Sequence, residues 1–127
     1  MASDFGLFIG FGLPRAGREQ QALEVFAEAR QFNEQLEQRG DIDSYETVLL
    51  ELHGGELGGF TLLRGSTEKL NRLRYENEEF TNLIAKANLS VGNLGVVGAS
   101  LGDGIMRQVA ALQGAIQSLQ PTGSASR

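Results

Sequence analysis

Cysteine is absent from the 127-residue sequence. Without it there is no disulfide framework, no thiolate metal site and no cysteine nucleophile. A chain of this kind agrees with a reducing compartment. The fold must therefore be held by packing, and a domain of this length buries about two-thirds of its unfolded surface, enough to form a core without covalent cross-links.

Basic residues are also few. Lysine and arginine together number 11, against 16 aspartates and glutamates, which gives a formal net charge of −5. The basic side chains are scattered among acidic ones, whereas nucleic acid favours clustered lysine and arginine. We therefore expect no nucleic-acid partner.

The sequence has no hydrophobic run of membrane-spanning length near its start. The apolar stretch Phe5–Leu13 is shorter than the about 20 residues that a spanning helix needs. Asp4 stands where a signal peptide would carry basic residues. We interpret the stretch as a buried strand, and we expect a cytoplasmic protein without a membrane partner.

The N-terminal apolar stretch alternates as a strand should. Its first face carries four large apolar side chains, namely Phe5, Leu7, Ile9 and Phe11. Its second face carries Phe8 among glycines, namely Gly6, Gly10 and Gly12. Glycine inside a strand often marks the close approach of a backbone or a ligand.

The next three elements follow from periodicity and turn residues. A stripe of apolar residues at helical spacing predicts a helix over Arg18–Arg39, which Gly40 ends. Alternation predicts a second strand over Tyr45–His53. The glycine-rich link 54–59 joins it to a third strand, Phe60–Arg64, as an antiparallel hairpin.

The second half repeats the plan. Ser66 has the character of a helix cap, and an apolar stripe predicts a helix to about residue 87 that is divided near 75–78. A fourth strand is expected over Leu94–Leu101, and a last helix starts near Asp103. We expect one domain over 1–120 and a flexible tail over 121–127, which is rich in glycine and serine.

This order predicts an α+β domain of β-α-β-β-α-β plan with an extra C-terminal helix. Right-handed crossovers place both main helices on one face of a four-stranded antiparallel sheet. The other face stays open, and we expect Phe8, Tyr45 and Leu49 on it. A half-apolar open face of this size calls for a partner, and a twofold homodimer is the commonest solution.

One family shares this arrangement. The segment 66–70, Ser-Thr-Glu-Lys-Leu, and the segment 77–83, Asn-Glu-Glu-Phe-Thr-Asn-Leu, look like the broken second helix of the dimeric α/β-barrel proteins, whose subunits are ferredoxin-like. The resemblance covers most of residues 5–101. It implies a dimeric α/β barrel. The group includes cofactor-free monooxygenases, small isomerases and haem-binding enzymes, and fold alone does not carry function.

Candidate chemistry centres on the only histidine. His53 stands two residues from Glu51, so on a strand both would share the open face, about 6.5–7 Å apart. The carboxylate would orient the imidazole as a general base. We name His53 and Glu51 as candidate catalytic residues of a cofactor-free monooxygenase or isomerase. Candidate ligand-binding residues beside them are Tyr45, Phe8, Arg64 and Arg15.

His53 also has a structural interpretation, in which it caps the hairpin loop while Glu51 pairs with Arg64. Some proteins that resemble this plan bind haem through one histidine, which leaves His53 as a haem-ligand alternative. A protein-only zinc site needs three or four nitrogen or sulfur ligands. We expect no metal site and no required cofactor.

The loop between the first strand and the first helix looks at first like a phosphate loop. It fails that pattern because Arg18 replaces the lysine and Glu19 replaces the magnesium-binding hydroxyl residue. An anion site at the helix N-terminus that uses Arg15 or Arg18 stays open. The simpler interpretation is a turn with ordinary surface arginines.

Three functional hypotheses result. The first is a homodimer with a small-molecule pocket between its two sheets. The second makes this pocket catalytic through His53 and Glu51. The third is a structural or interaction protein whose open face serves assembly alone.

Overall fold

The computed structural model describes residues 4–120, so the tail over 121–127 lies outside the described residues. The elements follow the expected order, with one helix divided in two. They are β1 (Phe5–Phe11), α1 (Glu19–Arg39), β2 (Ser44–Leu49), β3 (Gly59–Arg64), α2 (Thr67–Glu76), α3 (Glu78–Ser90), β4 (Gly95–Ser100) and α4 (Asp103–Leu119).

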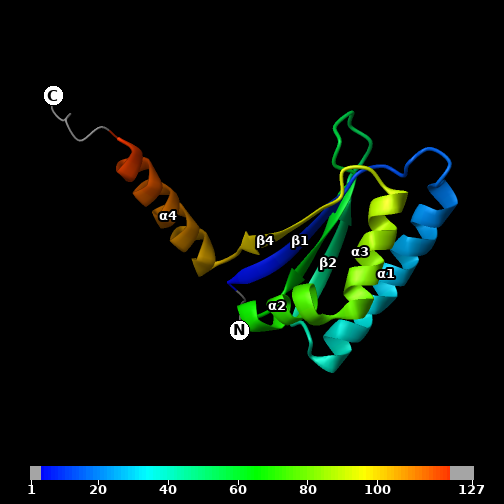
Figure 1. Ribbon diagram of the computed structural model, residues 1–127, viewed down its shortest axis with the longest axis horizontal. Helices are drawn as coiled ribbons and strands as arrows, with labels where there is room; N and C mark the ends of the chain where they lie inside the picture. The colour runs from blue at the N-terminus through cyan, green and yellow to red at the C-terminus, as the bar shows by residue number, and fades with distance from the viewer. Residues whose placement is uncertain (1–3, 121–127) are drawn as a thin grey trace.

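The four strands form one antiparallel sheet in the order β2-β3-β1-β4. The central strand β1 pairs with β3 on one side and β4 on the other, so that Leu7 lies opposite Leu63 and Gly98. Helices α1, α2 and α3 lie against a single face, as Figure 1 shows. The expected α+β plan, with the main helices on one face, is confirmed.

Local signals explain the helix ends. Gly40 has φ of 78°, the left-handed conformation that glycine accepts readily, and its N–H donates to carbonyls of the last turn of α1. Ser66 caps α2 by accepting from the Lys69 N–H. Asn77 is extended and caps α3 by accepting from the Phe80 N–H, which confirms the predicted division of the second helix.

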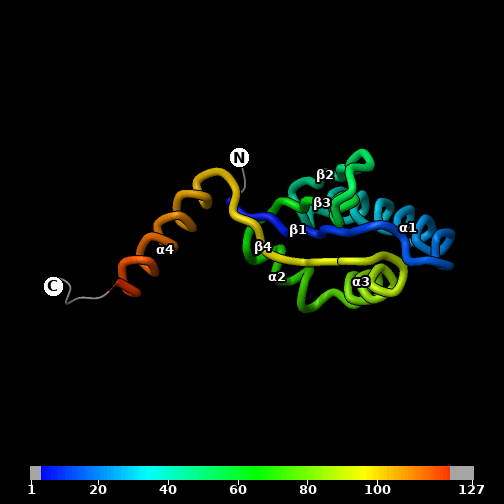
Figure 2. The backbone as a smooth tube through the Cα atoms, turned by 90° about the horizontal axis from the view of Figure 1, so that it is seen from above, coloured from blue at the N-terminus to red at the C-terminus, as the bar shows by residue number. Residues whose placement is uncertain are grey.

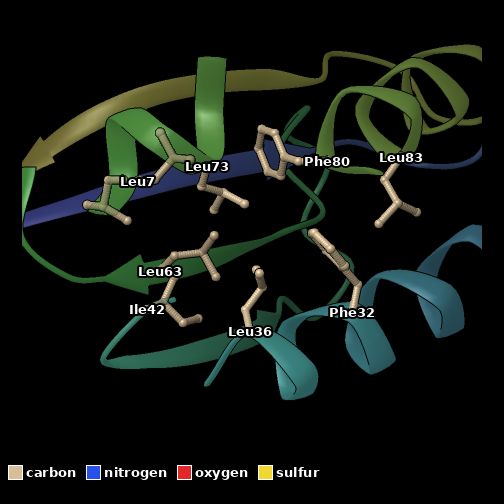
Figure 3. Close-up of a cluster of buried hydrophobic side chains, with 9 residues drawn as sticks. Leu7, Phe32, Leu36, Ile42, Leu63, Leu73, Phe80 and Leu83 are labelled. Carbon is tan, nitrogen blue, oxygen red and sulfur yellow. The ribbon is translucent and has the colours of Figure 1, made fainter. Parts of the chain in front are cut away.

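The core fills the space between the sheet and helices α1, α2 and α3. Leu63 and Leu36 are fully covered, and Phe80 and Phe32 meet them from α3 and α1 (Figure 3). The cluster consists of Leu7, Phe32, Leu36, Ile42, Leu63, Leu70, Leu73, Phe80 and Leu83. Burial of these side chains drives the folding of the domain.

The second strand is shorter than expected. We predicted Tyr45–His53, but β2 ends at Leu49, which is the last residue that pairs with β3. The next residue, Leu50, donates its N–H to the Gly58 carbonyl, and residues 50–58 form a loop. The partner strand β3 begins only at Gly59, so the residues beyond Leu49 have no strand to pair with.

The faces of β2 are also reversed from the prediction. Tyr45 lies opposite Leu63 and Leu49 lies opposite Gly59, and cross-strand partners share a face. Leu63 belongs to the core, so Tyr45 and Leu49 point to the helix side. The placement of Tyr45 and Leu49 on the open face was therefore wrong.

Helix α4 contacts the sheet near its first turns and then extends away from it (Figure 1). Figures 1 and 2 show it extending past the end of the sheet, on the side opposite to α1 and α3. Gly102 is its N-cap, and Asp103 lies in the first turn without a side-chain capping bond. Within residues 4–120, no helix is long and apolar enough to cross a membrane.

Candidate functional site

The face of the sheet opposite to α1, α2 and α3 is called the open face here. Register places Phe8 beside Leu62 and Val97, and Val48 beside Phe60. Its side chains come from all four strands and are Ser44, Glu46, Val48, Phe8, Phe60, Leu62, Arg64, Val97 and Ala99. The centre of this face is therefore apolar.

An aromatic pair marks the middle of the open face. The rings of Phe8 and Phe60 stack with centroids 5.2 Å apart and planes inclined by 29°. Both are only partly buried, and the neighbouring Val97 is 55% exposed. Aromatic side chains bury a large apolar area and contribute strongly to the energetics of interfaces.

The glycines of β1 do not leave an empty space on this face. A Cβ atom at Gly10 would lie 2.7 Å from the Phe8 ring, and one at Gly6 would lie 2.9 Å from the Leu62 side chain. Leu57 and Leu101 also come close to these positions. The bare backbone of β1 is therefore covered by neighbouring apolar side chains.

Arg64 has a different partner from the one expected. Its Nη1 lies 3.3 Å from the Glu46 carboxylate, on the open face and near its edge. The suggested Glu51–Arg64 pair was therefore wrong, because Glu51 follows the end of β2 and does not continue its alternation. A partly exposed pair of this kind contributes only a fraction of a kcal/mol, about 0.2–1.

His53 lies in the loop 50–58, so it does not share a strand face with Glu51. Its Nε2 lies 2.8 Å from the Leu57 carbonyl, and the Gly55 N–H donates to Nδ1 at 3.1 Å. This arrangement requires the proton on Nε2. The imidazole thus ties the loop together, as in the structural interpretation of this residue.

Arg15 and Arg18 serve the β1–α1 loop. The Arg15 Nε donates to the Asn88 carbonyl at 3.2 Å, and its backbone N–H donates to the Ser90 carbonyl. Arg18 is the N-cap residue of α1 without a side-chain capping bond, and its guanidinium pairs with Gln21. The Arg15 contacts join the start of α1 to the end of α3.

Tyr45 contacts the first helix. Its hydroxyl donates to the Glu34 carboxylate at 2.7 Å. This hydrogen bond raises the pKa of Tyr45, because ionisation of the phenol would lose the bond and place two negative charges together. The predicted ligand-binding residues Tyr45 and Phe8 are thus separated on opposite faces of the sheet.

A second feature is a cleft on the helix side of the sheet. It has a volume of about 370 Å³ and lies between α1, α3 and the end of the sheet where β1 finishes. Its walls are mainly apolar, and they include the edge-to-face pair Phe11–Phe26, whose centroids are 6.2 Å apart. Arg30, Asn33, Thr61 and Ser90 are its polar lining residues.

Sequence reasoning missed this cleft and its polar residues. Asn33 falls seven residues after Phe26 and four after Ala29, within the buried stripe of α1. A polar side chain inside an apolar helical stripe was the signal that could have pointed to it. Within residues 4–120, no group of three or more His, Cys, Asp or Glu residues could hold a metal ion.

Comparisons with known proteins support the fold. No protein-family model matches the sequence, and no curated protein matches it. The structure is similar to a dimeric protein of unknown function and ferredoxin-like fold from Bacteroides fragilis. The TM-score is 0.56 at 12% sequence identity, over 80% of this chain and 100% of that one. The chain therefore has a ferredoxin-like fold.

Proposed function

We propose that this protein works as a homodimer of the dimeric α/β-barrel type, in which two copies pair through the open face. The observation that carries the proposal is the stacked Phe8–Phe60 pair at the centre of an apolar face that α1, α2 and α3 leave free. The ferredoxin-like protein that it resembles is itself described as dimeric.

The position of α4 favours the same assembly. The helix extends on the side of the open face (Figure 1). Five of its apolar residues share one stripe and are 39–84% exposed, namely Ile105, Val109, Leu112, Ile116 and Leu119. A copy seated on the open face would come within reach of this stripe, since 17 residues of helix span about 25 Å.

The open face supports assembly better than a pocket between the two sheets. Apolar side chains cover the glycines of β1, so the space that a ligand would use is already filled. A small-molecule pocket between the sheets stays a prediction, as do the catalytic roles of His53 and Glu51. We therefore favour the third hypothesis, an interaction protein, for this face.

A charge placed on the open face tests the proposal. Val97→Glu should shift the population to monomers, because a buried unpaired carboxylate in the dimer is costly, whereas Val97 is exposed in the single copy. Leu89→Glu is the matched control, since Leu89 is similarly exposed at 58% but lies on α3, on the other side of the sheet.

Sedimentation velocity measures both variants. The expected result is a monomer for Val97→Glu and an unchanged dimer for Leu89→Glu. Equal behaviour of the two variants would show that the open face is not the interface.

A further inference from the structure

The cleft between α1 and α3 differs from the open face because buried polar residues are among those that line it. Its volume of about 370 Å³ falls within the usual range for small-molecule sites, about 300–1,000 Å³. Such sites combine apolar walls with a few placed polar groups. The cleft has apolar walls from Phe26 and Leu50, with Asn33 among its lining residues.

Asn33 is the unusual residue. Its exposure is 6%, and no hydrogen bond to its side chain exists among residues 4–120. A buried amide without partners costs about 1–3 kcal/mol, and native proteins rarely keep one without a reason. The other two buried polar lining residues are satisfied, because Ser90 donates to the Lys86 carbonyl and Thr61 bonds to Thr47.

Arg30 supplies a positive charge at the cleft. It stands three residues before Asn33 on α1, so the two side chains are neighbours on the helix surface. Arg30 lines the cleft, is exposed, and forms no ion pair within residues 4–120. The nearby Glu34 carboxylate is engaged by the Tyr45 hydroxyl.

We propose that the cleft binds a small lipophilic carboxylate. The apolar body lies against the walls, and the carboxylate accepts hydrogen bonds from the Asn33 amide and the Arg30 guanidinium. Charge-assisted bonds of this kind are about twice as strong as neutral ones, and arginine suits carboxylates because its N–H groups form a planar fork. The ligand thereby satisfies the buried amide.

The cleft lies away from the proposed dimer interface on the open face. The cleft lies on the helix side, and its lining residues include Phe11 and Gly12 at the end of the sheet where β1 finishes. Helix α4 starts at the opposite end, where Ser100 of β4 pairs with Phe5. The ligand site therefore does not depend on the proposed assembly, and the two can fail separately.

Decanoate is the probe, and 1-decanol is its uncharged counterpart. The chain has no tryptophan, so Leu23→Trp provides a single reporter on a cleft-lining residue that is 62% exposed. The expected result is saturable quenching or enhancement by decanoate. Decanol should bind about tenfold more weakly, because it lacks the charge that Arg30 recognises.

Two substitutions test the polar end of the cleft in this reporter background. Arg30→Gln and Asn33→Leu should each weaken decanoate about tenfold or more. Arg72→Gln is the control, because Arg72 is exposed on α2 and does not line the cleft. Asn33→Leu should also raise the melting temperature of the ligand-free protein, since it removes an unsatisfied buried amide.

Several results would overturn the proposal. These are no saturable decanoate signal, equal affinity for decanoate and decanol, or unchanged affinity in Arg30→Gln and Asn33→Leu. If the tryptophan fluorescence changes with protein concentration but not with decanoate, the cleft is covered by a second copy of the chain. None of these results bears on dimerisation through the open face, which is measured without ligand.

Discussion

The hydrogen-bond partners of single polar residues show which of them have a structural role and which could bind a ligand. His53 and Glu51 looked like a pair because alternation placed them on one strand face. In the structure both ring nitrogens of His53 form hydrogen bonds with the backbone of the loop 50–58. The Tyr45 hydroxyl likewise donates a hydrogen bond to the Glu34 carboxylate on α1. Asn33, which no motif marks, is a buried polar residue whose side chain has no hydrogen-bond partner among residues 4–120.

The Tyr45 phenol should titrate above its ordinary value near 10. The Glu34 hydrogen bond stabilises the neutral phenol and raises its pKa, so this contribution to stability is full below pH 10 and is lost as pH rises through the folded-state pKa. Tyr75→Phe leaves Tyr45 as the only tyrosine, because the sequence has two. Ultraviolet titration of the phenolate band should then give a raised pKa, and Glu34→Gln should lower it. A pKa unaffected by Glu34→Gln would contradict the hydrogen bond.

Replacement of His53 should affect the loop and little else. His53→Ala removes two hydrogen bonds of a solvent-exposed loop, so the free energy of unfolding should fall by about 1 kcal/mol or less. Amide exchange should become faster at Gly55, which donates to the imidazole. Denaturant unfolding and hydrogen exchange measure the two effects. Unchanged exchange at Gly55 would mean that the imidazole does not hold the loop.

At the scale of elements, much of the fold follows from local sequence. The faces of β1 follow from strict alternation, and the break at Asn77 follows from a residue that caps helices well. The strand β2 was misjudged for a physical reason. Both of its faces mix apolar and polar residues, so alternation does not say which one faces α1. The end of β2 depends on where its partner strand β3 begins, and this pairing is set by tertiary structure rather than by local sequence.

The sequence predicts that helix α4 forms, but it does not predict where the helix lies relative to the sheet. Its apolar stripe is visible in the sequence, but the stripe does not tell whether the helix packs on its own sheet. In the structure α4 touches its own domain through Arg107, which pairs with Asp4 at 2.9 Å, and through Gln108, which bonds to Ser100. These two contacts involve none of the residues of the apolar stripe, which stay exposed.

The stripe of α4 should contribute to dimer stability. Leu112→Glu puts a charge into the apolar stripe and should weaken the dimer, because the stripe is uncovered in the single copy and would be buried against a partner. Ala110→Glu is the control on the opposite side of the same helix. Dilution experiments with fluorescence anisotropy give the dissociation constants. A similar effect of both substitutions would argue that α4 plays no part in assembly.

At the scale of the whole molecule, the domain presents two unlike surfaces. The open face is an apolar sheet surface with a stacked aromatic pair, suited to another copy of itself. The cleft on the other side is small, apolar and provided with an amide and a guanidinium, suited to a small ligand. The sheet separates the two, so assembly and ligand binding can be assigned to different sides of one fold.

The mass of the wild-type protein in solution tests the central claim most directly. Multi-angle light scattering during size-exclusion chromatography should give twice the 13.7 kDa chain mass across a range of protein concentrations. A stable dimer is expected because the open face and α4 together offer apolar area of the kind that permanent interfaces bury. A single species of 13.7 kDa at every concentration would contradict the account.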